Sequence, residues 1–122
     1  MELEIREDKP IFLQLKEELE DCVLRGVYPE ETQIPSTIEL AVTLKLNPAT
    51  TNRAVSLLVA DGILYKKRGI GMFVCPGARE AIAMKRRSAF YESYVVPLIA
   101  ECRSLGMPKE DLMSMIERGC SE

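Results

Sequence analysis

The sequence contains no histidine among its 122 residues. The commonest general base near neutral pH and the commonest metal ligand are therefore missing, which argues against most hydrolytic and metal-dependent enzymes. Its four cysteines are separated by 53, 27 and 18 positions, so none forms the C-x-x-C pair of zinc or dithiol chemistry. We expect reduced thiols, no catalytic residues, no metal and no cofactor.

Long apolar runs are missing as well. The chain has no stretch of about 18 or more apolar residues, and its N-terminus has no basic-then-apolar leader. We therefore expect no membrane span, no secretory signal and a cytoplasmic protein. Its length and its composition, 47% hydrophobic and 29% charged, fit one globular domain or a small domain with an appendage.

Charge is unevenly distributed along the chain, although the total is only −3. Residues 1–44 carry a net charge of −7, residues 45–87 carry +7, and residues 88–122 carry −3. A basic segment in an otherwise acidic protein attracts phosphates at one place while the rest of the surface repels them. The same pattern also fits a solvated basic face, so charge alone leaves both interpretations open.

The first helix is expected to begin at Pro10. From there, apolar residues recur at spacings of three and four, with acidic residues on the other side. Gly26 is the expected end of this amphipathic helix, because glycine relieves left-handed strain at a helix C-terminus.

Two short helices are expected next. Ser36 and Glu39 form a capping-box pattern, which starts the second helix. Asn47 and Pro48 provide an N-cap and a proline at the first helical position, so a third helix begins there and continues to Asp61. The turn of about three residues between these helices is typical of a helix-turn-helix.

A β-hairpin is expected after Gly62. Residues 63–65 and 72–75 form two short apolar runs, and between them lies the basic, glycine-rich stretch 66–71. Apolar runs that flank such a turn predict two antiparallel strands with a cationic tip.

The C-terminal part is expected to be helical, over residues 78–105 and again near 112–116, with Pro97 bending or splitting the longer helix. A wide apolar stripe runs along it, and two partners could cover that stripe: a second copy of the chain or the first helix of the same chain. The stripe consists of Phe90, Tyr91, Tyr94, Val95, Leu98, Ile99, Cys102 and Leu105.

Three helices followed by a basic hairpin are the plan of a winged helix-turn-helix, and residues 10–75 resemble the DNA-binding domain of GntR-family transcriptional regulators. The resemblance rests on Pro10-Ile11-Phe12 with Gln14, Ile34-Pro35-Ser36 with Glu39-Leu40-Ala41, Asp61-Gly62-Ile63, and Arg68-Gly69-Ile70-Gly71-Met72-Phe73-Val74.

The third helix is similar to an Asn-Pro variant within that family. Residues 47–50 together with Arg53-Ala54 resemble the YtrA-type subfamily, which has a short two-helix C-terminal segment. The resemblance implies a mainly α fold with a small β-hairpin: a winged helix-turn-helix DNA-binding domain at residues 1–76 and a helical dimerisation segment at 77–122. It implies a homodimeric regulator of double-stranded DNA, more often a repressor, acting at an inverted-repeat operator, with control of nearby transporter genes. Any small-molecule effector is unidentified.

The third helix also predicts a DNA-reading face from its periodicity alone. If Thr51, Ala54, Val55 and Leu58 face the core, the opposite side is small and polar, with Thr50 at the flank. Arg53 could then donate two hydrogen bonds to guanine, and Asn52 could pair with adenine or bond a phosphate. Both also fit ordinary solvated surface residues. The outward-facing residues are Ala49, Asn52, Arg53 and Ser56.

Contacts to the DNA backbone are expected at helix starts and at the hairpin. Amides and hydroxyls converge on anions at helix N-termini, and glycines allow the hairpin to approach the minor groove. Ser36 also has a purely structural use as a cap. The expected backbone contacts are Ser36, Thr37, Thr50, Lys67, Arg68 and Gly69.

One position departs from the family pattern. Where the family usually carries an arginine two residues after the serine of its Pro-Ser motif, this chain has Ile38. Together with the acidic total charge, this departure leaves a second interpretation open, in which the winged-helix domain binds a protein instead of DNA. An enzyme with Cys75 or Cys102 as nucleophile has less support, because no histidine could activate the thiol. A redox-sensing thiol is a further alternative.

Overall fold

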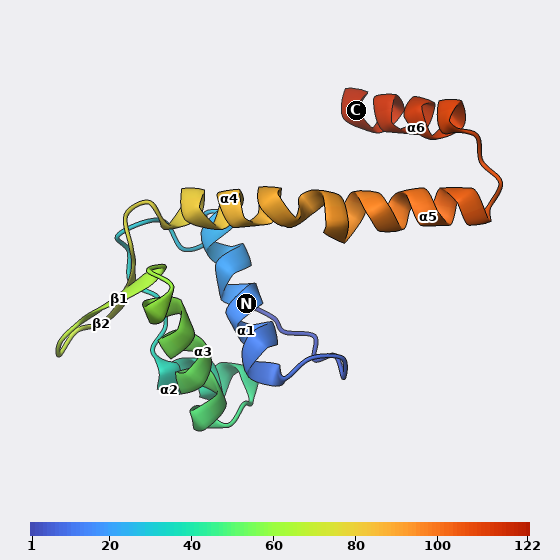
Figure 1. The fold of residues 1–122 in the computed structure, drawn as a ribbon. Coiled ribbons are helices and arrows are strands. Elements are labelled where there is room, and N and C mark those ends of the chain that lie inside the picture. Colours follow the sequence, from blue (N-terminus) through green and yellow to red (C-terminus); the bar gives the residue numbers. More distant parts are fainter. The chain divides into compact units, whose positions relative to one another are not determined.

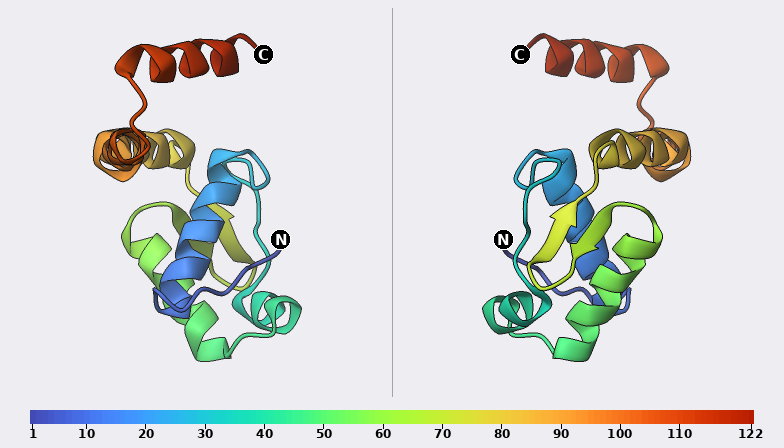
Figure 2. Two further views of the ribbon diagram at one scale, coloured as in Figure 1. Left: turned by 90° about the vertical axis from the view of Figure 1, so that its right-hand side faces the viewer. Right: turned by 90° about the vertical axis from the view of Figure 1, so that its left-hand side faces the viewer.

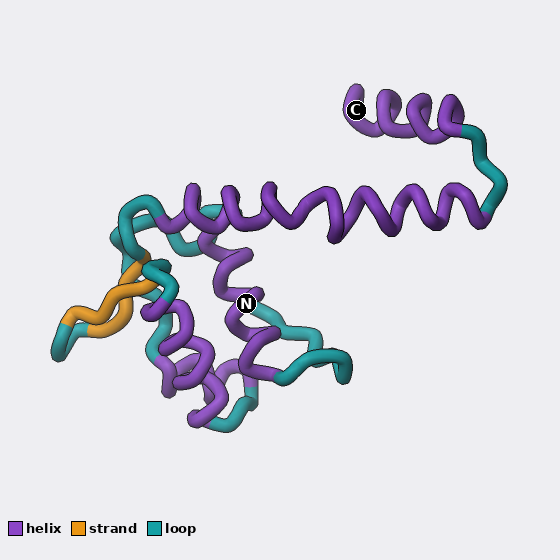
Figure 3. The backbone as a smooth tube through the Cα atoms, viewed as in Figure 1, coloured by secondary structure: helices purple, strands orange, loops and turns teal.

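The computed structural model describes residues 1–122 and divides into two compact units, 1–84 and 85–122. A single hairpin interrupts an otherwise helical chain (Figures 1 and 3). The architecture is the predicted mainly α fold, in which three helices precede a two-stranded wing. Its elements are α1 (Ile11–Leu24), α2 (Thr37–Leu44), α3 (Pro48–Ala60), β1 (Leu64–Lys67), β2 (Gly71–Val74), α4 (Ala78–Phe90), the π-helical turn η1 (Tyr91–Val95), α5 (Val96–Ser104) and α6 (Lys109–Ser121).

The apolar side of α1 lies at the centre of the first unit and packs against α3. Leu15, Leu19 and Val23 are almost completely buried, at the spacing of an amphipathic helix. The helix ends at its C-cap Arg25, and Gly26 follows with a φ of 80°, in the left-handed region that favours glycine. The predicted first helix and its end are therefore confirmed.

An ion pair joins α1 to the residue that caps the C-terminus of α3. Lys16 Nζ lies 3.1 Å from Asp61 Oδ2 and 3.9 Å from Glu20 Oε2. Burial lowers the pKa of Lys16, but the hydrogen bond to Asp61 and the negative charge of Glu20 outweigh that effect, so the pKa is raised. Lys16 therefore remains charged although it is half-buried between two helices.

Side-chain caps start both helices of the helix-turn-helix, as predicted. Ser36 Oγ accepts the Glu39 backbone N–H at 3.0 Å, and a Glu39 carboxylate oxygen accepts the Ser36 N–H at 3.2 Å. Asn47 Oδ1 accepts the Ala49 N–H at 2.8 Å, and Pro48 is the first residue of α3. The N-termini of α2 and α3 are therefore determined locally, before any packing.

A buried hydroxyl determines how α3 lies against α2. Thr51 is completely buried, and its hydroxyl can donate to the carbonyl of Thr37, at 3.1 Å, or to that of Pro48, at 3.0 Å. Figure 2 shows α2 and α3 beside α1 and the hairpin. Further core residues come from α2, α3, the hairpin, the start of α4 and the loop before α2: Ile34, Leu40, Ala54, Val55, Leu58, Ile63, Leu64, Val74, Ala78 and Ile82.

The hairpin strands differ by one or two residues from the sequence expectation of 63–65 and 72–75. The antiparallel pairing runs from Leu64 opposite Val74 to Lys67 opposite Gly71, so the turn contains only residues 68–70. Ile63 instead lies before the strand, buried, and its carbonyl accepts the Cys75 N–H at 2.8 Å. The antiparallel pairing therefore extends both strands by one or two residues toward the tip of the hairpin.

The loop before α2 holds the hairpin from one side. The Ile34 N–H donates to the Met72 carbonyl at 3.0 Å, and Gln33 Nε2 donates to the Ile70 carbonyl at 3.0 Å. Gly71 has a φ of 148°, and a Cβ at this position would collide with Gln33 Nε2. The positive φ therefore favours glycine here, and a larger residue would also have to displace the amide at the end of the Gln33 side chain.

The second unit contains a helix that changes its hydrogen-bonding pattern. Pro97 lies in the first turn of α5 and has no N–H to donate to the preceding turn. The π-helical turn η1, in which each backbone hydrogen bond spans five residues, comes directly before it. This wider turn lies where the regular α-helical hydrogen bond of Pro97 is missing. The expected irregularity is present, but it lies before Pro97, because the carbonyl left without a donor belongs to the preceding turn.

Large apolar side chains of the second unit are exposed. Tyr94 is 66% and Leu105 65% exposed, and the rings of Phe90 and Tyr94 lie 5.3 Å apart. Of the predicted stripe, Cys102 is buried and Val95 and Ile99 are half-buried. None of the helices is long and apolar enough to span a membrane. Other exposed apolar residues of this unit are Tyr91, Val96, Leu98, Met113, Met115 and Ile116.

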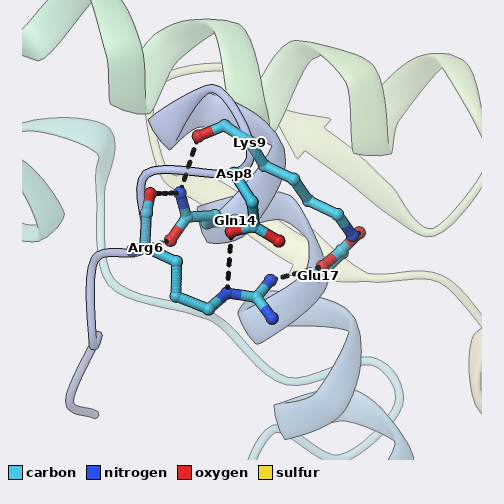
Figure 4. Close-up of polar contacts among 5 residues, drawn as sticks. All are labelled: Arg6, Asp8, Lys9, Gln14 and Glu17. Carbon is cyan, nitrogen blue, oxygen red and sulfur yellow. Dashed lines mark hydrogen bonds and ion pairs between the residues drawn. The ribbon is translucent and has the colours of Figure 1, made fainter.

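A buried amide ties the N-terminal segment to α1 (Figure 4). Gln14 Oε1 accepts the Arg6 N–H at 2.8 Å, and Gln14 Nε2 donates to the carbonyls of Arg6 and Lys9 at 2.6 and 2.8 Å. At the surface, Lys9 Nζ pairs with Glu17 Oε1 at 2.7 Å. Gln14 is only 4% exposed. Its amide therefore provides hydrogen-bond partners for the backbone groups of Arg6 and Lys9, just before α1 begins.

Replacing Gln14 with alanine should lower the free energy of unfolding by about 1–3 kcal/mol, because it removes three hydrogen bonds around a buried amide. The matched control Lys9→Ala breaks an exposed ion pair and should cost less than about 1 kcal/mol. Urea unfolding followed by circular dichroism measures both. Equal losses would contradict the role assigned to Gln14.

Gly71→Ala should destabilise the first unit by about 1–3 kcal/mol, because the new Cβ meets Gln33 and the backbone conformation is strained. In a Gln33→Ala background the same change should cost less, since the collision is gone. A double-mutant cycle measured by chemical unfolding gives the coupling between the two positions. Strictly additive effects would show that Gln33 does not constrain position 71.

Candidate nucleic-acid interface

A groove of about 430 Å³ lies where the start of α2, one side of α3 and the hairpin meet. Its apolar lining comes from Val55, Val59 and Met72. The remaining lining contains hydroxyls, one amide and one ammonium group, although most of the exposed lining surface is apolar. These residues are Ser36, Thr37, Asn52, Ser56 and Lys66, together with Gly71.

The exposed side of α3 is small and polar, as its periodicity predicts. Thr51, Ala54, Val55 and Leu58 are buried. Asn52 and Ser56 line the groove and, with Ala49 one turn earlier, lie along one side of the helix. The residues expected to face outward, Ala49, Asn52, Arg53 and Ser56, are exposed, and so are Pro48, Val59 and Ala60, whereas Thr50 is half-buried at the flank.

Arg53 points toward α1 and does not line the groove. The central carbon of its guanidinium lies 3.8 Å from the centroid of the Phe12 ring. A cation over an aromatic face at this distance is attracted by the negative charge of the ring face. The structure therefore brings Asn52 and Ser56 together with the hairpin, whereas Arg53 lies on the neighbouring side of α3 beside Phe12 of α1.

The start of α2 forms another part of the groove. Ser36 and Thr37 both line it and are half-buried, and the Ser36 hydroxyl also caps the helix. Ile38 follows in the first turn with 71% of its surface exposed, and Val42, one turn later, is 75% exposed. The position that departs from the family pattern is thus a solvent-facing apolar residue and offers no cation.

The two lysines of β1 lie on opposite faces of the hairpin. Side chains alternate along a strand, so Lys66 shares a face with buried Leu64 and, opposite Met72, lines the groove. Lys67 lies on the other face, with its Nζ 4.2 Å from the centroid of the Phe73 ring. Lys66 is therefore a candidate that reasoning from the sequence missed, although alternation from Leu64 was the signal for it.

The hairpin tip contains the remaining expected residues. Arg68 and Gly69 are exposed in the three-residue turn, and Gly69 has a φ of 78°, which glycine adopts without strain. The tip is therefore a cationic loop that also carries the exposed side chain of Ile70.

The cysteines do not form a reactive cluster. All four are free thiols, and burial raises the pKa of Cys22 and of Cys75. A raised pKa leaves less thiolate, which is the reactive form in oxidation and nucleophilic attack. No three histidine, cysteine, aspartate or glutamate side chains converge in a way that could hold a metal ion.

Comparison with known proteins assigns this arrangement to a family. The model described as "Bacterial regulatory proteins, gntR family" matches residues 12–74, from α1 to the end of β2. The HTH-type transcriptional repressor YtrA of Bacillus subtilis is 25% identical over 117 residues, which cover 96% of this chain and 89% of YtrA. The uncharacterized HTH-type regulator YurK of the same bacterium is 34% identical over 86 residues, 69% of this chain but only 36% of YurK.

Solved structures share the fold. A putative GntR-family regulator from Bacteroides thetaiotaomicron is 32% identical, with a TM-score of 0.71, covering 92% of this chain and 97% of that one. The DNA-binding domain of AraR in complex with operator ORX1 is 28% identical, with a TM-score of 0.56, covering 62% of this chain and 95% of that domain. This protein therefore belongs to the GntR family of bacterial transcriptional regulators and carries its helix-turn-helix DNA-binding domain, with YtrA among its homologues.

Proposed function

We propose that this protein is a sequence-specific DNA-binding repressor that acts as a homodimer on an inverted-repeat operator. The observation that carries the proposal is the groove in which the polar side of α3, the start of α2 and the cationic hairpin meet. A related domain, that of AraR, has been solved in complex with operator DNA. Because a bacterial transcriptional regulator acts on DNA inside the cell, the proposal places the protein in the cytoplasm.

In this proposal, α3 enters the major groove with its polar side toward the bases. Ala49 and Ser56 are small enough for close approach, and Asn52 pairs with adenine or bonds a phosphate. Thr50, at the flank near the start of α3, donates to the backbone, as do Ser36 and Thr37 at the start of α2.

Arg53 is the proposed guanine-reading residue. Its contact with Phe12 uses the face of the guanidinium, whereas the N–H donors lie in the plane of that group and point away from the ring. Stacking therefore limits the rotamers of a long side chain while it leaves donors available for a base edge. Phe12 in α1 would then orient a residue of α3.

The hairpin is proposed to contact the minor groove and its phosphates through Lys67, Arg68 and Gly69. Gly69 permits close backbone approach, and each cation that neutralises a phosphate releases counterions. Binding should therefore weaken steeply with salt, by about 0.9 in the logarithmic slope for each phosphate contact.

Arg53→Ala should lower the affinity for promoter DNA of the protein's own operon about 5- to 100-fold, because a bidentate base contact is worth about 1–3 kcal/mol. A mobility-shift titration against unrelated competitor DNA measures this. Arg25→Ala, which removes an exposed arginine from the end of α1, is the matched control and should bind like the wild type. If the wild type fails to retard the promoter at low salt, the protein-binding alternative is favoured, with exposed Ile38 and Val42 as its surface.

The homodimer is proposed to form through the second unit. Its exposed apolar side chains, including Tyr94 and Leu105, exceed the scattered apolar residues of an ordinary surface. A twofold contact would bury them and present two α3 helices to half-sites about 34 Å apart, which requires an inverted repeat.

Tyr94→Glu should convert the dimer to a monomer, because it places a charge among apolar side chains. Analytical ultracentrifugation measures the mass, and circular dichroism checks that the helices remain. Val27→Glu, at a similarly exposed apolar position of the first unit, is the matched control and should stay dimeric. A monomeric wild type would instead favour coverage of the apolar stripe within one chain.

A further inference from the structure

Two large apolar side chains of α2 face solvent instead of the core. Ile38 and Val42 lie one turn apart and are the most exposed large apolar residues of the first unit, whereas Leu40 and Ala41 of the same helix are buried. Packing within the first unit therefore does not account for Ile38, and the proposed reading of bases by α3 leaves this residue without a role.

The first turn of α2 lies against the early part of α3. The Thr51 hydroxyl can donate to the Thr37 carbonyl at 3.1 Å, and Ile38 is the next residue after Thr37. On the α3 side, Thr51 is followed by Asn52, which lines the same groove as Thr37. Ile38 therefore lies beside the part of α3 that the proposed function places in the major groove.

The capping box holds this first turn in a defined conformation before DNA binds. Ser36 Oγ accepts the Glu39 N–H, and the Glu39 carboxylate accepts the Ser36 N–H, so these two bonds enclose residues 37 and 38. Isoleucine is branched at Cβ, and a single χ1 rotamer predominates for it in a helix. Ordering the Ile38 side chain against DNA therefore costs little conformational entropy.

The major groove offers an aliphatic side chain one kind of apolar group. Every base pair presents hydrogen-bond donors and acceptors there, and thymine adds a methyl group at C5. Isoleucine has no donor or acceptor, so against a phosphate or the edge of a G·C pair it would remove water from polar groups without replacing their hydrogen bonds. Against a thymine methyl group it buries apolar surface of both partners.

We propose that Ile38 contacts the methyl group of one thymine in each operator half-site and is a specificity-determining residue. The proposal rests on the proposed function, because it requires α3 in the major groove. It extends the interface of Ser36 and Thr37 by one residue. The two hydroxyls position the protein on the DNA backbone, whereas Ile38 distinguishes a T·A pair from a G·C pair.

The test removes the methyl group from the DNA and the aliphatic side chain from the protein. Footprinting of the full-length chain on the promoter of its own operon locates the operator, and deoxyuridine then replaces the corresponding thymines of the two half-sites, one position at a time. Fluorescence anisotropy measures each affinity. For the wild type, replacement at one position should weaken binding about fourfold per half-site, the effect of leaving one methyl group unburied. With Ile38→Ala, replacement at that position should have little further effect.

Val27→Ala is the matched control, because it shortens an exposed apolar side chain elsewhere in the first unit. This variant should keep the wild-type affinity and the wild-type response to deoxyuridine at every position. Circular dichroism and thermal unfolding check that both variants are folded.

The outcomes separate this proposal from the function on which it rests. If the wild type binds the operator but Ile38→Ala responds to deoxyuridine as the wild type does, the thymine contact is overturned and DNA binding stands. If the response is lost with Val42→Ala and kept with Ile38→Ala, the assignment to Ile38 is also overturned. If the wild type binds no promoter DNA at low salt, both proposals fail together.

Discussion

The burial of one side of α3 is the constraint on which the rest of the first unit depends. Ala54 and Leu58 are completely buried, and together with Thr51 they fix the rotation of the helix about its own axis. The Thr51 hydroxyl then joins α3 to the first residue of α2. Because a helix turns about 100° per residue, this single choice of buried side also decides which residues face solvent.

The packing around α3 places basic residues that are close in the sequence on different surfaces of the first unit. Phe12 in α1 takes the guanidinium of Arg53, and the hairpin brings Lys66 into the groove on the neighbouring side. The ion pair between Lys16 and Asp61 joins α1 to the end of α3 without reaching that groove. Within residues 45–87, positive charge therefore lies in three separate places, Arg53 beside Phe12, Lys66 in the groove and Lys67 on the opposite face of the hairpin, whereas a charge count treats it as one.

The two units differ in how they place their apolar residues. The first buries its apolar residues around α3 and presents a groove whose lining combines apolar residues with a few polar ones. The second leaves large apolar residues such as Tyr94 exposed, and its helix passes through a π-helical turn before Pro97. The first unit also includes the start of α4, because Ala78 and Ile82 are buried in its core.

The sequence by itself determined the helices, their caps and the polar side of α3, because these depend on signals that act within one or two turns. Ser36 with Glu39 and Asn47 with Pro48 are such signals, and so is the periodicity that buries Leu58. Tertiary structure decided the rest. Phe12 and Arg53 meet only because α1 packs on α3. Lys66 enters the groove because burial of Leu64 sets the phase of a strand whose side chains alternate every residue.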